Sequence, residues 1–331
     1  MFNQMRYTNT RLRLGVFLLA ALFLSACSHT PQTKALPESG FAEAAKELES
    51  VPFYPQTQYQ CGPAALATVM QYRGVDVLPD DLVDKVYIPE KQGSLQIEMV
   101  AATREQGLVP YVIEPELTAI LAQIEAGHPV LVMQNLAYSW MPYWHYAVVV
   151  GFDVAENELI LRSGETKRWQ TSFAAFERTW ARSDYWGLVI VPPDTVPADA
   201  SLTRWMQAAY DLQQTGQTQT AETAYQTAMQ HWPEAADPGI ALANLYFEQG
   251  DFARADEAYA DLLANKPDTA VLWNNRAYTL QALDCNVTAQ QAAQCAQKLS
   301  PDDANIASTV EEMQQNSATN AANCPVINCP E

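Results

Sequence analysis

The feature that most constrains the fold is an internal repeat in the C-terminal part of the chain. Pro233, Pro267 and Pro301 are evenly spaced along it. Other positions keep the same register relative to these prolines: Ala209, Ala243 and Ala277; Ala221, Ala255 and Ala289; Tyr225, Tyr259 and Ala293; Trp205 and Trp273; Gly216 and Gly250. A period of about 34 residues predicts stacked helix pairs, with small residues where helices cross and a proline after each pair.

The periodic stretch resembles the tetratricopeptide repeat, and three repeats would cover residues 202–303. An accidental period in an alanine-rich helical stretch is the alternative. Repeats of this kind present a concave surface, so we expect them to bind a protein or peptide partner. Before them, VPPDTVPADAS predicts a Pro-rich linker over residues 193–201, and a Cys-containing tail, 304–331, follows them.

The residues before the linker have a different pattern. Residues 61–74, 94–107 and 115–127 read as amphipathic helices that each end at a glycine. Four apolar stretches after them read as strands: 129–135, 145–153, 157–164 and 186–191. Helices followed by strands predict an α+β domain over residues 49–192, ahead of an all-α domain.

The N-terminus resembles a bacterial lipoprotein signal. Arg6, Arg11 and Arg13 precede the apolar run LGVFLLAALFLSA, which is too short for a stable span and has the flanks of a signal peptide. The run ends in LSAC, which resembles a lipobox. This resemblance implies a signal peptide over 1–26, a lipid on Cys27, a tether over 27–48, and a periplasm-facing protein. Ser28 favours the outer membrane. An uncleaved anchor or an accidental match is the alternative.

The charge of the chain excludes some partners. Nineteen basic and 38 acidic residues give a net charge of −19, and removal of the three arginines with residues 1–26 brings it to about −22. Such a field repels nucleic acid and anionic headgroups. We therefore expect no nucleic acid partner and membrane attachment through the lipid alone. No cofactor and no metal site are expected.

The chain has six cysteines; Cys27 is expected to carry the lipid, and four of the other five lie close to the C-terminus. Cys285, Cys295, Cys324 and Cys329 predict two disulfides in an oxidising compartment. Cys285 and Cys295 are separated by most of three helical turns, beyond the ~7 Å Cα limit for a direct bond. We therefore expect each to pair with a tail cysteine, although a bond within the tail stays open. Cys61 is left alone.

Cys61 stands where a helix is expected to begin, in CGPAALATVMQYRG. The positive end of a helix lowers a thiol pKa, so we predict thiolate character near neutral pH. A small buried apolar residue is the alternative role. Among the four histidines, His145 opens a strand after the aromatic stretch AYSWMPYW. It could take the thiol proton, or it could be a core or capping residue.

Together, Gln56, CGPAAL at residues 61–66 and HYAVVVGF at residues 145–152 resemble the bacteriocin-processing (double-glycine) peptidase family, which has a papain-like fold. The resemblance covers about 49–192. It implies a cysteine peptidase with Cys61 as nucleophile, His145 as general base and acid, and the Gln56 side chain in the oxyanion hole with the Cys61 backbone amide.

The chain departs from that family at two site positions. Gln56 lies five residues before the cysteine instead of six, and Gln58 and Gln60 are alternatives. The family's aspartate is missing after the histidine, and the residues expected opposite His145 are Ser163 and Glu165. Either could orient the imidazole, Ser163 as a neutral acceptor and Glu165 as an anion. Loss of such an orienter can cost about 10⁴ in rate in serine proteases, so activity could be weak or absent.

These observations predict a lipid-anchored cysteine peptidase whose repeats recruit its peptide or protein substrate. The sequence contains no transporter helices and no ATP-binding motif, so leader trimming beside an exporter is not implied. The alternatives are an inactive papain-like scaffold that binds partners through the repeats, and a thiol-dependent acyl or amide transferase. The aromatic stretch, residues 137–144, should line the cleft and favour apolar substrate side chains, unless it packs in the core.

Overall fold

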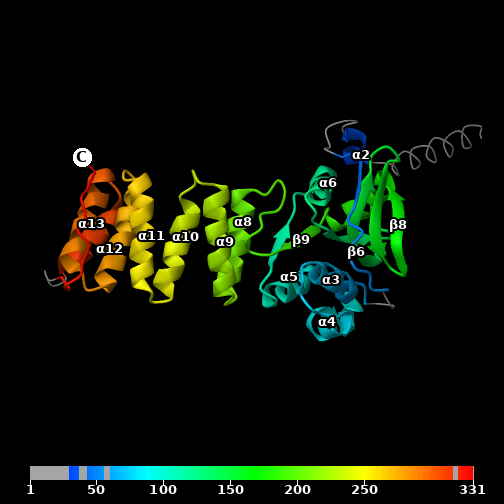
Figure 1. Ribbon diagram of the computed structural model, residues 1–331, viewed down its shortest axis with the longest axis horizontal. Coiled ribbons are helices and arrows are strands. Elements are labelled where there is room, and N and C mark those ends of the chain that lie inside the picture. The colour runs from blue at the N-terminus through cyan, green and yellow to red at the C-terminus, as the bar shows by residue number, and fades with distance from the viewer. Residues whose placement is uncertain (1–29, 37–42, 56–59, 316–319, 331) are drawn as a thin grey trace, which may run out of the picture. The chain divides into compact units, whose positions relative to one another are not determined.

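The computed structural model describes residues 30–36, 43–55, 60–315 and 320–330 (Figure 1). The chain divides into two compact units. One, which we call the sheet unit, comprises residues 1–102 and 112–190. The other, the helical unit, comprises residues 103–111 and 191–331. The domain boundaries drawn from the sequence stay a prediction.

A seven-stranded sheet within the described residues lies mostly in the sheet unit, although residues 109–111 and Val191 of its strands are grouped with the helical unit. Its strands run in the order β4-β9-β5-β6-β7-β8, and β1 pairs with β6 off this path. The bounds are β1 Ala45–Glu47, β4 Val109–Val112, β5 Val130–Asn135, β6 Trp144–Asp153, β7 Glu158–Ser163, β8 Thr166–Ser172 and β9 Gly187–Val191. The pairs for which a register is known are antiparallel, β1 with β6, β5 with β6 and β9, and β7 with β6 and β8. Every residue of β6 from His145 to Phe152 is buried, so this strand lies in the core of the unit.

Helices α3 Cys61–Tyr72, α6 Leu117–Glu125 and α7 Phe173–Trp180 pack against this sheet. Helix α4, Pro79–Val86, packs against α3, and α5 spans Gln96–Glu105. A small two-stranded hairpin of β2, Tyr87–Ile88, and β3, Gly93–Ser94, stands apart from the main sheet. In α3 every residue from Gly62 to Met70 is buried, because small and apolar side chains fill the whole circumference of its first turns.

The α+β order predicted from the sequence is confirmed, and each predicted helix and strand of this unit is present. Helices α4 and α7 and strands β4 and β8 were not predicted. Strand β8 lies at the edge of the sheet, and its residues from Thr166 to Gln170 are exposed. An exposed edge strand has no buried face, so it lacks the apolar alternation that marks a strand.

Parts of the stretch expected to be a tether are structured. Helix α2, Pro31–Ala35, lies against α7, where the fully buried carboxylate of Glu177 accepts hydrogen bonds from the amides of Gln32 at 3.0 Å and Thr33 at 2.7 Å. Strand β1 then joins β6. Cys27 lies outside the described residues, so the structure does not bear on the lipid.

The helical unit contains paired helices at the positions predicted by the sequence repeat. Their bounds are α8 Leu202–Gln214, α9 Thr218–His231, α10 Asp237–Glu248, α11 Phe252–Asn265, α12 Ala270–Ala282 and α13 Asn286–Leu299. Gly216 and Gly250 close two inter-helix turns with φ of 80° and 76°. Asp284, at the equivalent position of the third repeat, takes the same left-handed conformation at φ 60°.

The predicted tail begins with a further helix, α14, Ala304–Gln315. The predicted disulfides are confirmed, and each joins the third repeat to the tail. Cys285 bonds Cys324 with Cα atoms 5.5 Å apart, and Cys295 bonds Cys329 with Cα atoms 5.2 Å apart. The alternative of a bond within the tail is thereby excluded.

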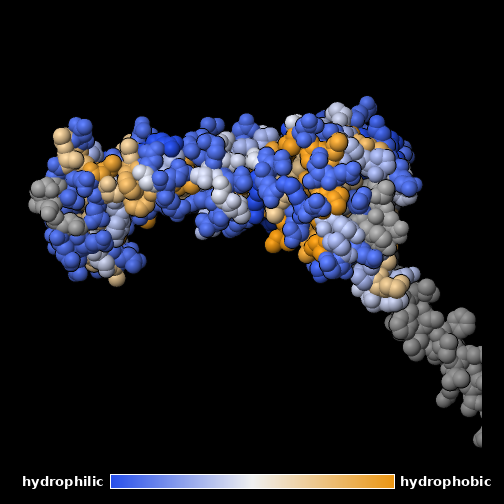
Figure 2. Space-filling model, turned by 90° about the horizontal axis from the view of Figure 1, so that it is seen from below, coloured by the Kyte–Doolittle hydropathy of each residue, from blue (hydrophilic) through white to orange (hydrophobic). Residues whose placement is uncertain are grey.

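The surface differs in character between the units. Figure 2 shows mostly hydrophilic residues on the face of the helical unit that it presents, whereas hydrophobic residues gather on the face of the sheet unit. In the described part of the chain, no helix combines the length and the apolar character that crossing a bilayer requires.

Candidate active site

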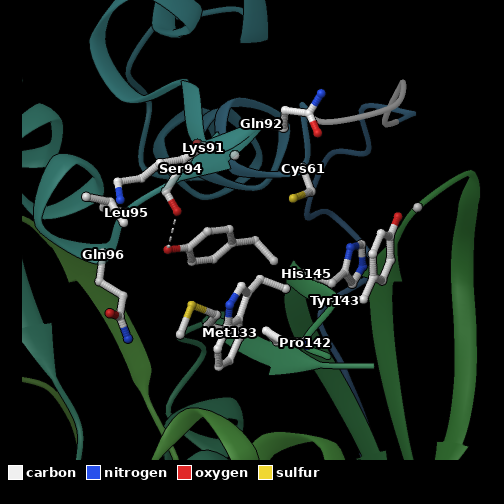
Figure 3. Close-up of a pocket in the computed structure, with 14 residues that line it drawn as sticks. Cys61, Lys91, Gln92, Ser94, Leu95, Gln96, Met133, Pro142, Tyr143 and His145 are labelled. Atoms are coloured by element: carbon white, nitrogen blue, oxygen red, sulfur yellow. Dashed lines mark hydrogen bonds between the residues drawn. The ribbon is translucent and has the colours of Figure 1, made fainter. Parts of the chain in front are cut away.

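The sequence-predicted nucleophile and base border one cavity. Cys61 opens helix α3 and His145 is the second residue of β6, so a helix start and a strand start meet at this point. The cavity has a volume of about 710 Å³, and both side chains line it. In Figure 3 Cys61 stands on one side of this cavity and His145 on another. Cys61 is a free cysteine and is half-buried.

The imidazole of His145 is held at one of its ring nitrogens. Nε2 of His145 lies 2.9 Å from Oγ of Ser163, at the end of β7. Burial lowers the pKa of His145 to about 4, so the ring is neutral at pH 7. The side chain is only 8% exposed. A neutral imidazole that donates from Nε2 to the serine keeps Nδ1 free as a base.

The structure corrects one prediction about Cys61. Burial raises the pKa of its thiol above the ordinary value, and hydrogen bonds from the backbone amides of Tyr146, Gly62 and Cys61 only partly offset this. The predicted thiolate at neutral pH is therefore wrong for the free protein, because loss of hydration outweighs the helix-start amides. The bond from the Tyr146 amide also places the sulfur beside the residue that follows His145.

A second wall of the cavity comes from the β2–β3 hairpin, which sequence reasoning missed. Lys91, Gln92, Gly93 and Ser94 of this hairpin all line the cavity. The Ser94 hydroxyl is buried without a hydrogen-bond partner and lies so close to Gly62 that any Cβ there would overlap it. Glycine is thus required after Cys61 to let the hairpin approach. Pro89 and Gly93 were the only local signs of this turn.

The structure places the remaining predicted site residues differently. Glu165 lies exposed in the turn between β7 and β8 and does not line the cavity. Of the two candidate orienters, the structure brings only Ser163 to His145. Gln56 and Gln58 lie outside the described residues, and Gln60 directly precedes α3.

The other described histidines do not line this cavity. Nη2 of Arg73 lies 2.8 Å from Nδ1 of His128, and burial together with that guanidinium lowers the pKa of His128 to about 4. His231 is exposed at the end of α9. Across the described ranges, no group of three or more Asp, Glu, Cys or His residues could hold a metal ion.

Two family models match the chain. The Peptidase_C39 like family matches residues 48–188, and a tetratricopeptide repeat model matches residues 212–282. Both resemblances seen in the sequence are confirmed by these matches. No curated protein sequence matches the chain.

Solved structures resemble each unit separately. A candidate C39-like peptidase from Bacillus anthracis is 15% identical, with 44% of this chain and 97% of that chain covered and a TM-score of 0.38. The peptidase domain of Streptococcus ComA, a bi-functional ABC transporter in quorum sensing, is 20% identical over 43% and 98%, with a TM-score of 0.35. The first tetratricopeptide domain of human RPAP3 is 17% identical over 34% and 90%, with a TM-score of 0.32.

Proposed function

We propose that the Peptidase_C39-like domain of this chain is a cysteine peptidase, and that its tetratricopeptide repeats recruit the peptide or protein it cleaves. The observation that carries the proposal is the shared cavity of Cys61 and His145, with Ser163 at Nε2 of the imidazole. This is the order of nucleophile, base and orienter that thiol-dependent acyl transfer needs.

The reaction starts from a neutral pair, because burial disfavours both the thiolate and the imidazolium. The Cys61 sulfur attacks the substrate carbonyl carbon while its proton passes to Nδ1 of His145. The backbone amide of Cys61 and the Gln56 side chain stabilise the oxyanion. The imidazolium then protonates the leaving amine, and water hydrolyses the thioester with His145 again as base. Ser163 holds the ring in the tautomer that this sequence requires.

The repeats would supply the recruitment step. Residues 202–315 hold fifteen Asp or Glu residues and five Lys or Arg residues, a net charge of about −10. Of the five cations, Arg254 and Arg276 are already paired with carboxylates at 3.2 Å or less. A partner with a basic segment would therefore be favoured, and its binding would weaken as salt is added.

We also propose the location indicated by the N-terminal sequence. A lipid on Cys27 would anchor the protein on a bacterial membrane, facing the periplasm, with the outer membrane favoured by Ser28. Two disulfides are consistent with an oxidising compartment.

A non-catalytic scaffold is the second candidate, and two observations favour it. Ser163 is neutral, so no carboxylate stabilises the imidazolium that must form, and the Cys61 thiol has a raised pKa. A protein that keeps this fold only to bind partners could tolerate both features. The two candidates differ in whether the thiol reacts with a peptide carbonyl.

The test compares the full chain with three variants. A fluorogenic peptide library should be cleaved by the wild type, and Cys61→Ala and His145→Ala should each lower the rate by at least about 10³-fold. His231→Gln is the control, since that histidine is exposed in the helical unit. A folded wild type that cleaves no peptide, and whose Cys61 reacts no faster with peptidyl electrophiles than with iodoacetamide, would leave the scaffold as the function.

A further inference from the structure

The loop between β5 and β6 exposes an unusual amount of apolar side chain. We call residues 136–144, which include the first residue of β6, the aromatic loop. The exposed fractions are 61% for Tyr138, 78% for Trp140, 55% for Met141, 57% for Tyr143 and 48% for Trp144. The alternative that this stretch packs in the core is thus excluded. Contiguous exposed apolar residues on a folded protein mark a binding surface.

Hydrogen bonds to two polar side chains hold the backbone of the aromatic loop in place. Asn135 is 1% exposed, and its Oδ1 accepts hydrogen bonds of 3.0 Å from the amides of both Ala137 and Tyr143. Nη1 of Arg182 donates to the carbonyl oxygens of Asn135 at 3.1 Å and Ala137 at 2.7 Å. A loop with these bonds is ordered before any ligand arrives, so binding need not order it.

The aromatic loop is continuous with the cavity of the candidate active site. Pro142, Tyr143 and Trp144 line that cavity. Figure 3 shows the Tyr143 ring beside His145 at its rim. The loop therefore carries apolar surface from the solvent to the reacting groups. A surface that binds only a lipid bilayer or a second copy of the chain would not have to extend into the cavity.

The walls of the cavity carry little fixed charge. Among the described lining residues, Lys91 is the only one charged at pH 7, because His145 is neutral. Leu95 and Met133 add apolar surface to the walls. A charged substrate side chain would lose its hydration in this cavity, and the only charged residue that it would meet on the described walls is Lys91.

We propose that the aromatic loop is a substrate subsite that takes a bulky apolar side chain, such as Leu or Phe, close to the scissile bond. The inference rests on the proposed peptidase function and names its substrate class. Tyr143 and Trp144 form the inner part of the subsite, and Tyr138 and Trp140, which stack with ring centroids 5.7 Å apart, extend it outward. Discrimination by an apolar subsite is on the order of 10- to 100-fold.

The experiment measures the rate of Cys61 modification in the full chain by peptidyl acyloxymethyl ketones. The probes are identical except that one of the three positions next to the reactive group carries Leu, Phe, Ser or Asp, and rates are normalised to that of iodoacetamide. At one position Leu and Phe should react about 10- to 100-fold faster than Asp. Tyr143→Ala with Trp144→Ala should reduce that preference to about 3-fold or less. Trp169→Ala, on β8 and 51% exposed, is the matched control and should keep it.

A second measurement separates failure of the subsite from failure of the peptidase. The same peptides as unreactive amides are titrated into Cys61→Ser, with tryptophan fluorescence as the readout. Preferential binding of the Leu and Phe peptides, lost in the double variant, would keep the subsite even if nothing is cleaved. Equal binding of all four peptides, or a preference that survives in the double variant, would overturn it. Two further results would also overturn the subsite if no peptide preference exists. One is a blue shift of tryptophan fluorescence on addition of phosphatidylethanolamine vesicles, and the other is a dimer of the chain, in each case lost in Trp140→Phe.

Discussion

The Nε2 atom of His145 lies 2.9 Å from the Oγ atom of Ser163. The partner of this ring nitrogen is thus a neutral hydroxyl and not a carboxylate. A hydroxyl can fix the tautomer of the ring, but it adds little electrostatic stabilisation to an imidazolium.

This contact predicts a lower rate for one substitution at Ser163 and a higher pKa of His145 for another. Ser163→Ala should lower kcat/KM by about 10- to 100-fold, because the ring loses the partner that orients it. Ser163→Asp should raise the pKa of His145 from about 4, since an anion favours the charged ring. NMR titration of the His145 ring protons measures that pKa. An unchanged pKa in Ser163→Asp would show that the two side chains are not in contact.

The pH dependence of Cys61 alkylation should reflect its burial. Since burial raises the pKa of the thiol, the iodoacetamide rate should inflect above the ~8.5 of an ordinary cysteine. Mass spectrometry of the Cys61 peptide across pH 6 to 10.5 gives the profile. An inflection near pH 7 or lower would contradict the neutral thiol and restore the thiolate predicted from the sequence.

Stability should fall in mildly acidic solution. His145 and His128 both have a pKa lowered from 6.5 to about 4 by burial. A group with a lowered folded pKa contributes stability above its unfolded pKa, and this is lost as pH falls from 6.5 toward 4. His145 alone should account for roughly 3 kcal/mol. Urea unfolding at pH 7, 6, 5 and 4.5 tests this, and His128→Gln should have a shallower dependence. A flat profile would count against both assignments.

Reduction of the disulfides should destabilise the helical unit selectively. Each bond closes a loop, of 39 residues for Cys285–Cys324 and 34 for Cys295–Cys329. Loss of one should lower the free energy of unfolding by about 2–4 kcal/mol. Chemical denaturation of Cys324→Ala and Cys329→Ala, monitored by circular dichroism, measures the loss. The candidate active site lies in the other unit, so an equal loss of Cys61 reactivity would be unexpected.

Cys27→Ala should release the protein from the membrane fraction. The lipobox-like LSAC sequence predicts a lipid on this cysteine, and a protein without it has only an apolar run that is too short for a stable span. Fractionation with a carbonate wash, read by immunoblot, tests this. A variant that still pellets and resists carbonate would show that the lipid is not the anchor.

The sequence by itself determined the features that depend on local pattern. The repeat specified the helix pairs, because helix length and turn position recur within each unit of sequence. The helix start at Cys61 and the strand at His145 followed from Pro63 and from an apolar run. The separation of Cys285 and Cys295 along one helix also indicated that each would bond the tail.

The tertiary structure decided what depends on residues far apart in the chain. The β6–β7 ladder has a register shift between Val149 and Gly151, so counting residues back from the turn does not give the partner of His145. The structure selects Ser163 over Glu165. The thiol pKa is raised by burial, and the cavity around Cys61 has walls from the β2–β3 hairpin and from Tyr146 as well as from its own helix. The backbone at the start of the aromatic loop is held by hydrogen bonds from Arg182, which follows α7 and is distant from the loop in sequence. Local sequence sets which backbone forms, whereas desolvation and register are properties of the packed assembly of elements.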